Sequence, residues 1–349
     1  MKRVVVRGIR TMVPMLVLAA AATGWAADKA VGPAPLYTGE WVVISDAIIK
    51  ELTPADAKPG SFDKDTAGIA VDRTNGDVYM MANNRGICKS TDKGATFALV
   101  SGKNVTGRFE TGWGINVDPE GKRLMCFSIY GSAAYSDDAG KTWTKSKKGH
   151  LDFGAVDWGD TGKALLAIGH ESGGTLMLSV DAGKEWKTLG KNFSATGIFD
   201  PKTLLTSGKD GGIDRSTDGG EKWENVSKEK LSAPVMVEFK KVGYWLGEGG
   251  LLTSKDKGAT WTVAVPLPKG ACLGPMFGKD ETHMVVGAPD GLYESKDAGK
   301  TWAFAVPLAP AIKINKRGWF GNYGWDPINN IFYASNMSKP AYKYVGTVK

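Results

Sequence analysis

The sequence predicts an all-β fold, a seven-bladed β-propeller, and three observations support this prediction. An eight-residue pattern, Ser-x-Asp-x-Gly-x-x-aromatic, occurs six times along the chain. Successive copies begin 46, 43, 37, 38 and 41 residues apart, a period typical of propellers, solenoids and arrays. Short apolar runs separated by turn residues fill each period, as in a propeller blade of four strands.

The apolar runs of the first two units show how a blade is built. Each run has five or six residues, and no helical period extends over a longer window. In the first unit the runs are GIAVD (68–72), DVYMMA (77–82) and GICKS (86–90); in the second they are GINVD (114–118), RLMCFS (123–128) and AAYSD (133–137). We expect each run to form one strand, with a fourth strand after the octet.

The octet has the chemistry of a tight turn. Its Ser hydroxyl and Asp carboxylate can accept hydrogen bonds from backbone N–H groups, and its Gly can adopt a backbone conformation that a side chain disfavours. The final Trp or Phe can pack a large ring between neighbouring sheets. We therefore expect a lock between the third and fourth strands, with structural acids; calcium binding by these acids is an alternative. The acids are Asp92, Asp138, Asp181, Asp218, Asp256 and Asp297.

The two ends of the chain complete a seventh blade. Three strand-like runs follow the last octet, at residues 317–326, 330–335 and 341–345, and a single run at 39–45 precedes the first blade. Together they make four strands, with the N-terminal one outermost. Such a closure removes exposed sheet edges from the ring. We predict seven blades, with six as the alternative.

The first residues resemble a secretory signal peptide. Lys2, Arg3, Arg7 and Arg10 precede an apolar run at 12–22, which is too short to span a bilayer, and small residues follow. We predict a signal peptide at 1–27, a single propeller at 28–349, and a secreted or periplasmic protein with no membrane span after cleavage. A retained N-terminal anchor is the alternative.

Net charge and cysteine content narrow the range of expected partners and cofactors. The chain has 44 basic and 37 acidic residues, and removal of the signal peptide leaves a net charge near +3, which does not favour nucleic acid as a partner. Cys88, Cys126 and Cys272 lack metal-ligand spacing and are expected to be small buried residues, although one disulfide is an alternative. No phosphate loop or dinucleotide motif occurs, so we expect no cofactor and no metal. We expect a monomer.

The octets are Asp boxes, and through them the chain resembles the sialidase-like propellers and the photosystem-stability-factor propellers. The resemblance covers nearly the whole mature chain. It implies a glycan-binding or glycan-cleaving site on the face opposite the boxes, or a protein-binding surface that catalyses nothing. Seven blades depart from many sialidases, which have six.

The loops expected on that opposite face supply the candidate site residues. Glycoside hydrolysis needs two carboxylates, and aromatic rings and arginines suit a polar ligand. The catalytic candidates are Glu110, Asp152, Glu248 and Tyr323. The ligand-binding candidates are Arg85, Arg108, His170, Asp210, Asp290, Arg317 and Trp319.

Sialidase activity itself is not favoured. Such an enzyme clamps a carboxylate with three arginines, for which Arg85, Arg108 and Arg317 remain, but the Arg-Ile-Pro motif of that family is missing. Another glycoside hydrolase, or a polysaccharide lyase with His150 or His170 as base, fits the enzyme hypothesis. The leading prediction is recognition of a glycan, with its cleavage left open; the alternative is a non-catalytic propeller that binds a cell-envelope protein.

Overall fold

The computed structural model describes residues 34–56, 66–109, 111–159, 163–169, 172–208, 211–315, 321–337 and 339–348. The predicted signal peptide lies outside these residues. One compact unit spans Pro35–Lys349. Its described residues are almost entirely β-structure, with one short helix, α1 (Asp46–Leu52), and one 3-10 turn, η2 (Gly102–Asn104).

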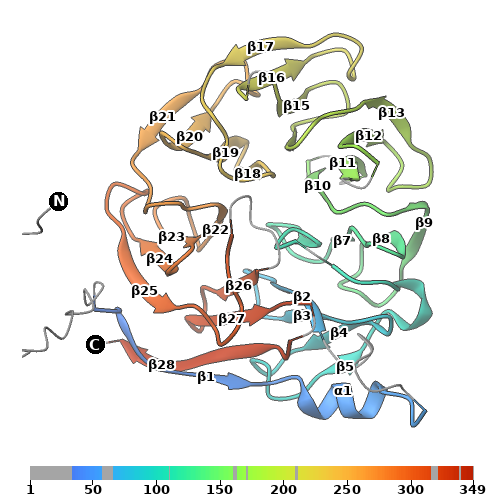
Figure 1. Cartoon of the computed structure of the whole chain (residues 1–349), viewed down its shortest axis with the longest axis vertical. Coiled ribbons are helices and arrows are strands. Elements are labelled where there is room, and N and C mark those ends of the chain that lie inside the picture. Colours follow the sequence, from blue (N-terminus) through green and yellow to red (C-terminus); the bar gives the residue numbers. More distant parts are fainter. Residues whose placement is uncertain are drawn as a thin grey trace, which may run out of the picture. The chain divides into compact units, whose positions relative to one another are not determined.

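The described residues form seven antiparallel sheets of four strands, which confirms the predicted blade count (Figure 1). Blade one holds β2 (Thr66–Val71), β3 (Val78–Ala82), β4 (Gly86–Ser90) and β5 (Ala98–Leu99). Blade two holds β6 (Ile115–Val117), β7 (Leu124–Cys126), β8 (Ser132–Ser136) and β9 (Thr144–Gly149). Blade three holds β10 (Phe153–Asp157), β11 (Ala164–Gly169), β12 (Thr175–Ser179) and β13 (Lys187–Gly190).

The remaining blades follow the same order. Blade four holds β14 (Thr196–Ile198), β15 (Leu204–Ser207), β16 (Ile213–Ser216) and β17 (Glu224–Ser227). Blade five holds β18 (Val237–Phe239), β19 (Val242–Gly247), β20 (Gly250–Ser254) and β21 (Thr262–Val265). Blade six holds β22 (Leu273–Phe277), β23 (Met284–Ala288), β24 (Gly291–Ser295) and β25 (Ala303–Pro307). Blade seven holds β26 (Asn322–Asp326), β27 (Ile331–Ser335), β28 (Tyr342–Val348) and, from the other end of the chain, β1 (Tyr37–Val43).

Strand β1 closes the ring as predicted. It pairs with β28 in antiparallel register from Tyr37 opposite Val348 to Val43 opposite Tyr342. The two backbones approach so closely at Gly39 that a Cβ there would lie 2.0 Å from the carbonyl oxygen of Val345. A side chain at this position would force the closing strands apart.

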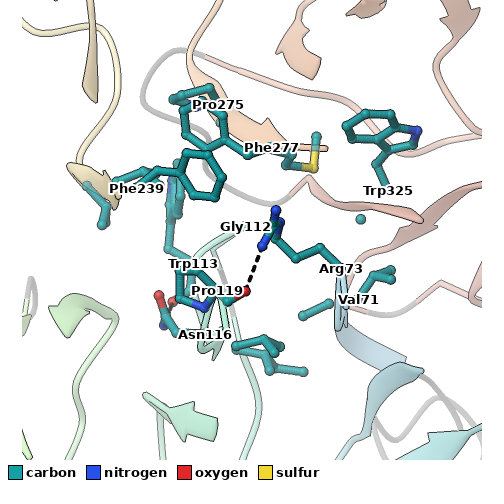
Figure 2. Close-up of a pocket in the computed structure, with 18 of the residues that line it drawn as sticks. Val71, Arg73, Gly112, Trp113, Asn116, Pro119, Phe239, Pro275, Phe277 and Trp325 are labelled. Carbon is teal, nitrogen blue, oxygen red and sulfur yellow. Dashed lines mark hydrogen bonds between the residues drawn. The ribbon is translucent and has the colours of Figure 1, made fainter. Parts of the chain in front are cut away.

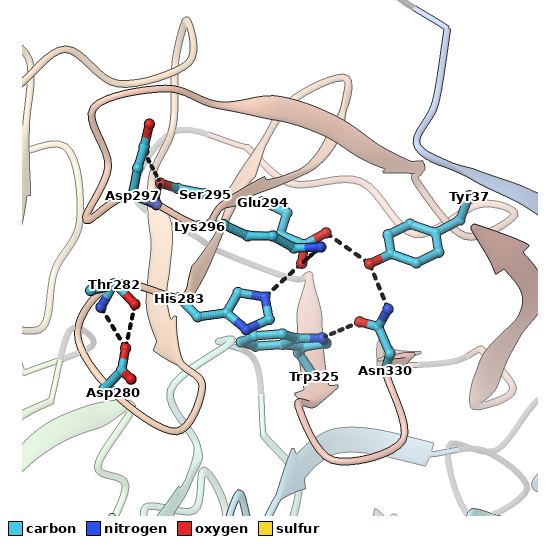
Figure 3. Close-up of polar contacts among 10 residues, drawn as sticks. All are labelled: Tyr37, Asp280, Thr282, His283, Glu294, Ser295, Lys296, Asp297, Trp325 and Asn330. Atoms are coloured by element: carbon cyan, nitrogen blue, oxygen red, sulfur yellow. Dashed lines mark hydrogen bonds and ion pairs between the residues drawn. The ribbon is translucent and has the colours of Figure 1, made fainter. Parts of the chain in front are cut away.

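A buried polar network joins the closing strand to blade six (Figure 3). The hydroxyl of Tyr37 donates to Oε2 of Glu294 over 2.8 Å, and Nε2 of His283 donates to Oε1 over 2.6 Å. Asn330 of blade seven donates to the Tyr37 oxygen, and the indole of Trp325 donates to Asn330. Although burial by itself raises the pKa of Glu294, the hydrogen bonds from His283 and Tyr37 hold it below the usual value. Closure therefore depends on a charged, fully paired carboxylate.

All six octets form the predicted lock between the third and fourth strands. In the copy at Ser254, the hydroxyl donates to Oδ1 of Asp256 and accepts the N–H of Gly258, each over 2.8 Å, and Asp256 accepts the N–H of Thr260. The residue before the Gly also takes a positive φ, for example 54° at Lys257, so two successive left-handed residues make each turn. The Ser side chains are buried in the turns, and the Asp carboxylates accept hydrogen bonds within their own turn.

The aromatic residue that ends each octet is half-buried, and two of these rings bond the preceding blade. Trp186 donates its indole N–H to Ser146 of blade two, and Trp302 donates to the carbonyl of Pro266 after blade five. Cys88, Cys126 and Cys272 are all buried, as expected for small core residues. Burial raises the pKa of Cys88 to about 12, so it stays a neutral thiol.

Candidate functional site

The strand order gives the ring two chemically distinct faces. The turns between first and second strands lie on the same face as the octets, here called the Asp-box face. The loops between second and third strands, and the connections between blades, lie on the other, here called the connection face. Arg85 and Glu248 follow second strands and therefore lie opposite Asp138 and Asp256, as expected.

Charge divides unequally between these faces. In the described loops of the Asp-box face, sixteen basic residues meet sixteen acidic ones. On the connection face, outside the rim segment 44–56, eight basic side chains are at least partly exposed: Arg85, Arg108, Lys191, Lys228, Lys230, Lys269, Lys313 and Lys339. The acids of these loops are Glu229, Glu248 and Asp290, together with the buried Asp152. The rim segment adds Lys50 and the exposed acids Asp46, Glu51 and Asp56. Among the described residues, the connection face is therefore net positive, whereas the loops of the Asp-box face are balanced.

An aromatic and cationic cluster lies on the connection face at blade two. The ring of Tyr130, which is 61% exposed, lies under the guanidinium of Arg108 at 4.6 Å from its centroid. The imidazole of His150 meets the same ring edge-on at 5.1 Å. A cation over an aromatic face and an edge-to-face ring pair are both favourable arrangements. They give the exposed ring a defined orientation.

Backbone hydrogen bonds hold the three segments of this cluster together. Arg108 and Ile129 exchange two bonds of 3.0 and 2.9 Å, and the Ser128 hydroxyl donates to the carbonyl of Thr106. The N–H of His150 bonds the carbonyl of Gly131. Two blade connections and one loop within a blade therefore form a single framework, although they come from separate parts of the sequence.

Two of the predicted catalytic residues are buried and therefore inaccessible to a substrate. Asp152 has no exposed surface and precedes β10. Tyr323 belongs to strand β26, and only 4% of it is exposed. The Tyr323 hydroxyl donates to the carbonyl of Ile312 and accepts the N–H of Ala309, while burial raises its pKa well above the usual range. These hydrogen bonds hold the segment between blades six and seven against β26, the innermost strand of blade seven.

Glu248 and Asp290 remain exposed on the connection face. Glu248 borders a pocket of about 620 Å³ between blades five and six, and it is the single acid among the described residues that line it. Asp290 accepts a hydrogen bond of 2.7 Å from Tyr293.

Arg85 is half-buried near the blade connection, because the neighbouring Asn84 bonds the backbone of Gly107. The predicted residues Glu110, His170, Asp210, Arg317 and Trp319 lie outside the described residues.

The central channel holds a second pocket, of about 190 Å³, between the inner strands of the blades. Figure 2 shows Arg73 reaching into it beside Pro119 and the rings of Phe239 and Phe277. The Arg73 guanidinium donates to the carbonyls of Pro119, at 2.8 Å, and of Gly278, and lies 4.8 Å from the Phe239 centroid. From the first turn of blade one, Arg73 thus contacts blades two, five and six at the Asp-box end of the channel.

A carboxylate with a raised pKa lies on the channel wall. Burial, together with the negative charge of Asp157, raises the pKa of Glu238 to about 7. Burial also raises the pKa of Asp157. Sequence reasoning missed Glu238 because its strand, β18, carries no motif.

The first turns of the blades contain a second recurring acid that was also missed. Asp72, Asp118, Asp157, Asp200, Asp280 and Asp326 each accept a backbone N–H from a residue two or three positions later. This is the Asx turn, in which a carboxylate replaces a backbone acceptor. The signal was present in the sequence as an acid that ends the first strand, or follows it within three residues, in six blades. Both sets of acids on the Asp-box face are therefore structural.

Within the described ranges, no three His, Cys, Asp or Glu side chains are arranged to hold a metal ion. None of the helices in these ranges combines the length and apolar character needed to cross a membrane.

Comparison with known proteins agrees with the turn chemistry. The BNR/Asp-box repeat family matches residues 134–145. No curated protein matches the chain. Among solved structures, the chain is similar to YCF48 bound to D1 peptide, with 13% identity, a TM-score of 0.47, and coverage of 90% of this chain and 99% of that one.

Two further solved structures are similar. YCF48 from Cyanidioschyzon merolae has 14% identity and a TM-score of 0.44, covering 87% of this chain and 98% of that one. An ancestral GH74 enzyme has 14% identity and a TM-score of 0.44, covering 80% of this chain and 44% of that one. Similarity at this level assigns no function. The sequence repeat and the seven sheets identify the chain as a seven-bladed β-propeller with Asp-box turns.

Proposed function

We propose that this chain is an exported binding protein whose connection face recognises an acidic polypeptide. The observation that carries the proposal is the difference in charge between the described parts of the two faces. With the rim segment 44–56 included, nine basic side chains meet six exposed acids on the connection face, whereas the described loops of the Asp-box face hold equal numbers. Charge complementarity of this kind steers association and selects partners. The predicted signal peptide supports an extracytoplasmic location.

Residue types on the connection face support recognition over catalysis. Tyr and Arg, which form the cluster of Tyr130 and Arg108, are enriched among the residues that dominate binding energy at protein interfaces. Hydrolysis of a glycoside needs two carboxylates about 5–10 Å apart. Among the described candidates Asp152 is fully buried, and Glu248 is the only acid bordering its pocket.

Glycan binding is the second candidate, and one observation favours it. The pocket of about 620 Å³ beside Glu248 is large enough for a sugar unit and lies on the predicted face. An anionic polysaccharide would also be attracted to the basic loops. The experiment therefore includes both kinds of polymer.

The test uses poly-L-glutamate and polygalacturonate as probes, with binding measured by calorimetry at two salt concentrations. We expect salt-dependent binding of poly-L-glutamate that falls several-fold in the double variant Lys228→Ser/Lys230→Ser. The matched control Lys163→Ser/Lys202→Ser removes the same charge from the Asp-box face, where both backbones bond octet turns, and should bind like the wild type. Equal losses in the two variants would contradict the proposal.

The measurements with polygalacturonate distinguish a polypeptide-binding protein from a glycan-binding protein and from an enzyme. Binding of polygalacturonate alone would replace the polypeptide with a glycan as the partner. Release of reducing ends or unsaturated products would establish an enzyme and overturn the binding-protein proposal. Absence of binding to both polymers would reject recognition by charge on this face.

A further inference from the structure

We infer that Tyr130 is the anchoring contact for the acidic polypeptide, and that its partner segment carries an apolar side chain beside its carboxylates. The inference rests on the proposed function and deepens it. Charge alone predicts diffuse attraction to the whole connection face. The cluster at blade two adds a fixed point of contact.

Exposure distinguishes Tyr130 from the other aromatic residues. Among the described residues it is the one aromatic with a largely exposed side chain; the other exposed large hydrophobic residues are aliphatic: Val43, Leu99, Val180, Val263, Ile328, Val345 and Val348. Tyr and Trp offer a large contact area at little cost in conformational entropy, because only two side-chain angles are ordered. An exposed tyrosine within a basic surface therefore has the chemistry of a binding hot spot.

The ring is oriented before any partner arrives. Arg108 lies over it and His150 meets it edge-on, so its side-chain angles are restricted in the free protein. Pre-organisation of this kind reduces the entropy lost on binding. The two neighbours act here as supports for the ring, and the partner contacts the exposed part of Tyr130 itself.

The backbone beneath the ring is held in an uncommon conformation. Tyr130 has φ of 57° and His150 has φ of 60°, both in the left-handed region. Such angles cost free energy for residues with side chains and persist where the surroundings impose them. Here the surroundings are the bonds between Arg108 and Ile129 and between His150 and Gly131. Strain that projects an exposed aromatic outward is typical of a site used for binding.

Charge complementarity selects the occupant. Arg108 beside the ring and the exposed lysines around the same face favour carboxylates. The ring provides apolar area that carboxylates cannot use. A polypeptide in which acidic and apolar side chains alternate satisfies both features, whereas a purely acidic chain satisfies only the first.

The test compares two synthetic peptides of equal length and charge, one built of Glu-Gly-Glu-Phe repeats and the other of Glu-Gly-Glu-Gly repeats. We expect the wild type to prefer the phenylalanine peptide by about fivefold or more, the change typical of a hot-spot residue. Tyr130→Ala should abolish the preference without changing the salt dependence, and Tyr130→Phe should keep it.

Controls separate this inference from the proposed function. Ile328→Ala removes a side chain that is 56% exposed on the Asp-box face and should retain the preference. Circular dichroism and thermal melting check that each variant is folded. Equal, salt-dependent binding of both peptides by the wild type would overturn the role of Tyr130 and leave the proposed function standing. Binding of neither peptide would overturn both.

Discussion

The two faces of the ring differ in how they use their polar side chains. On the Asp-box face, Ser and Asp of each octet, and the Asp of each Asx turn, bond the backbone of their own loop. On the connection face, the loops share no common sequence and their lysines are exposed. The repeated sequence of this chain therefore forms the scaffold, whereas the irregular loops form the surface that a partner can recognise.

The same difference predicts opposite consequences of substitution. Removing an octet or Asx-turn side chain from the Asp-box face breaks hydrogen bonds that hold the turn, so it lowers stability. Removing one from the connection face changes charge or contact area with little loss of stability, since surface substitutions away from such bonds are usually within about 0.5 kcal/mol.

The largest effect is expected at Glu294. Glu294→Ala leaves Tyr37 and His283 without their shared acceptor in a buried site, and should lower the free energy of unfolding by about 3 kcal/mol. The matched variant Glu248→Ala on the connection face should change it by less than about 0.5 kcal/mol. Urea denaturation measures both. Equal effects would show that closure does not depend on this carboxylate.

A smaller effect is expected in the octets. Ser254→Ala removes a donor to Asp256 and leaves the N–H of Gly258 unpaired in a buried turn, at a cost of about 2 kcal/mol. Ser232→Ala on the connection face removes a single bond to Ala271 and should cost about 1 kcal/mol or less. Thermal melts at one pH give the comparison. A larger loss for Ser232→Ala would reverse the assignment of structural roles.

A pH-dependent effect is expected at Glu238. Its pKa is raised to about 7 in the folded chain by burial and then by Asp157, above the value of about 4.3 typical of an unfolded chain. The folded state therefore binds the proton more tightly, and stability falls as pH rises from about 4.5 to about 7. Because Glu238 is partly exposed, we expect Glu238→Gln to stabilise the protein by only about 1 kcal/mol at pH 8.

At pH 4, where Glu238 is protonated in the folded state and mostly protonated in the unfolded state, the variant and the wild type should have nearly equal stability. Urea titrations at the two pH values measure the difference. A stabilisation of equal size at both would mean that the effect comes from packing and has no link to protonation.

The smallest effect on stability is expected from the lysines. The variants Lys228→Ser/Lys230→Ser and Lys163→Ser/Lys202→Ser should each stay within about 0.5 kcal/mol of the wild type. Only the first should weaken binding of poly-L-glutamate. Loss of stability in the first variant would indicate that connection-face lysines have a structural role, and would remove the contrast between the faces.

The candidate site was predictable in its location on the chain and much less so in its geometry. Loop position after a second strand placed Arg85 and Glu248 on the connection face, because strand direction alternates within a blade. It could not show that Asp152 is buried or that Tyr323 is bonded to the backbone of Ile312. Burial depends on what neighbouring blades contribute, and one loop sequence contains no such information.

What the sequence by itself determined is the repeating unit and its closure. Each octet encodes local hydrogen bonds within eight residues, and the incomplete blades at the two ends require each other, so period and turn chemistry suffice to predict seven blades. Tertiary structure alone decided which side chains meet across blades: Arg73 with Pro119 and Gly278, Glu294 with Tyr37, and Tyr130 with Arg108 and His150. These contacts join segments far apart in sequence, and they form only when the sheets are packed around the ring.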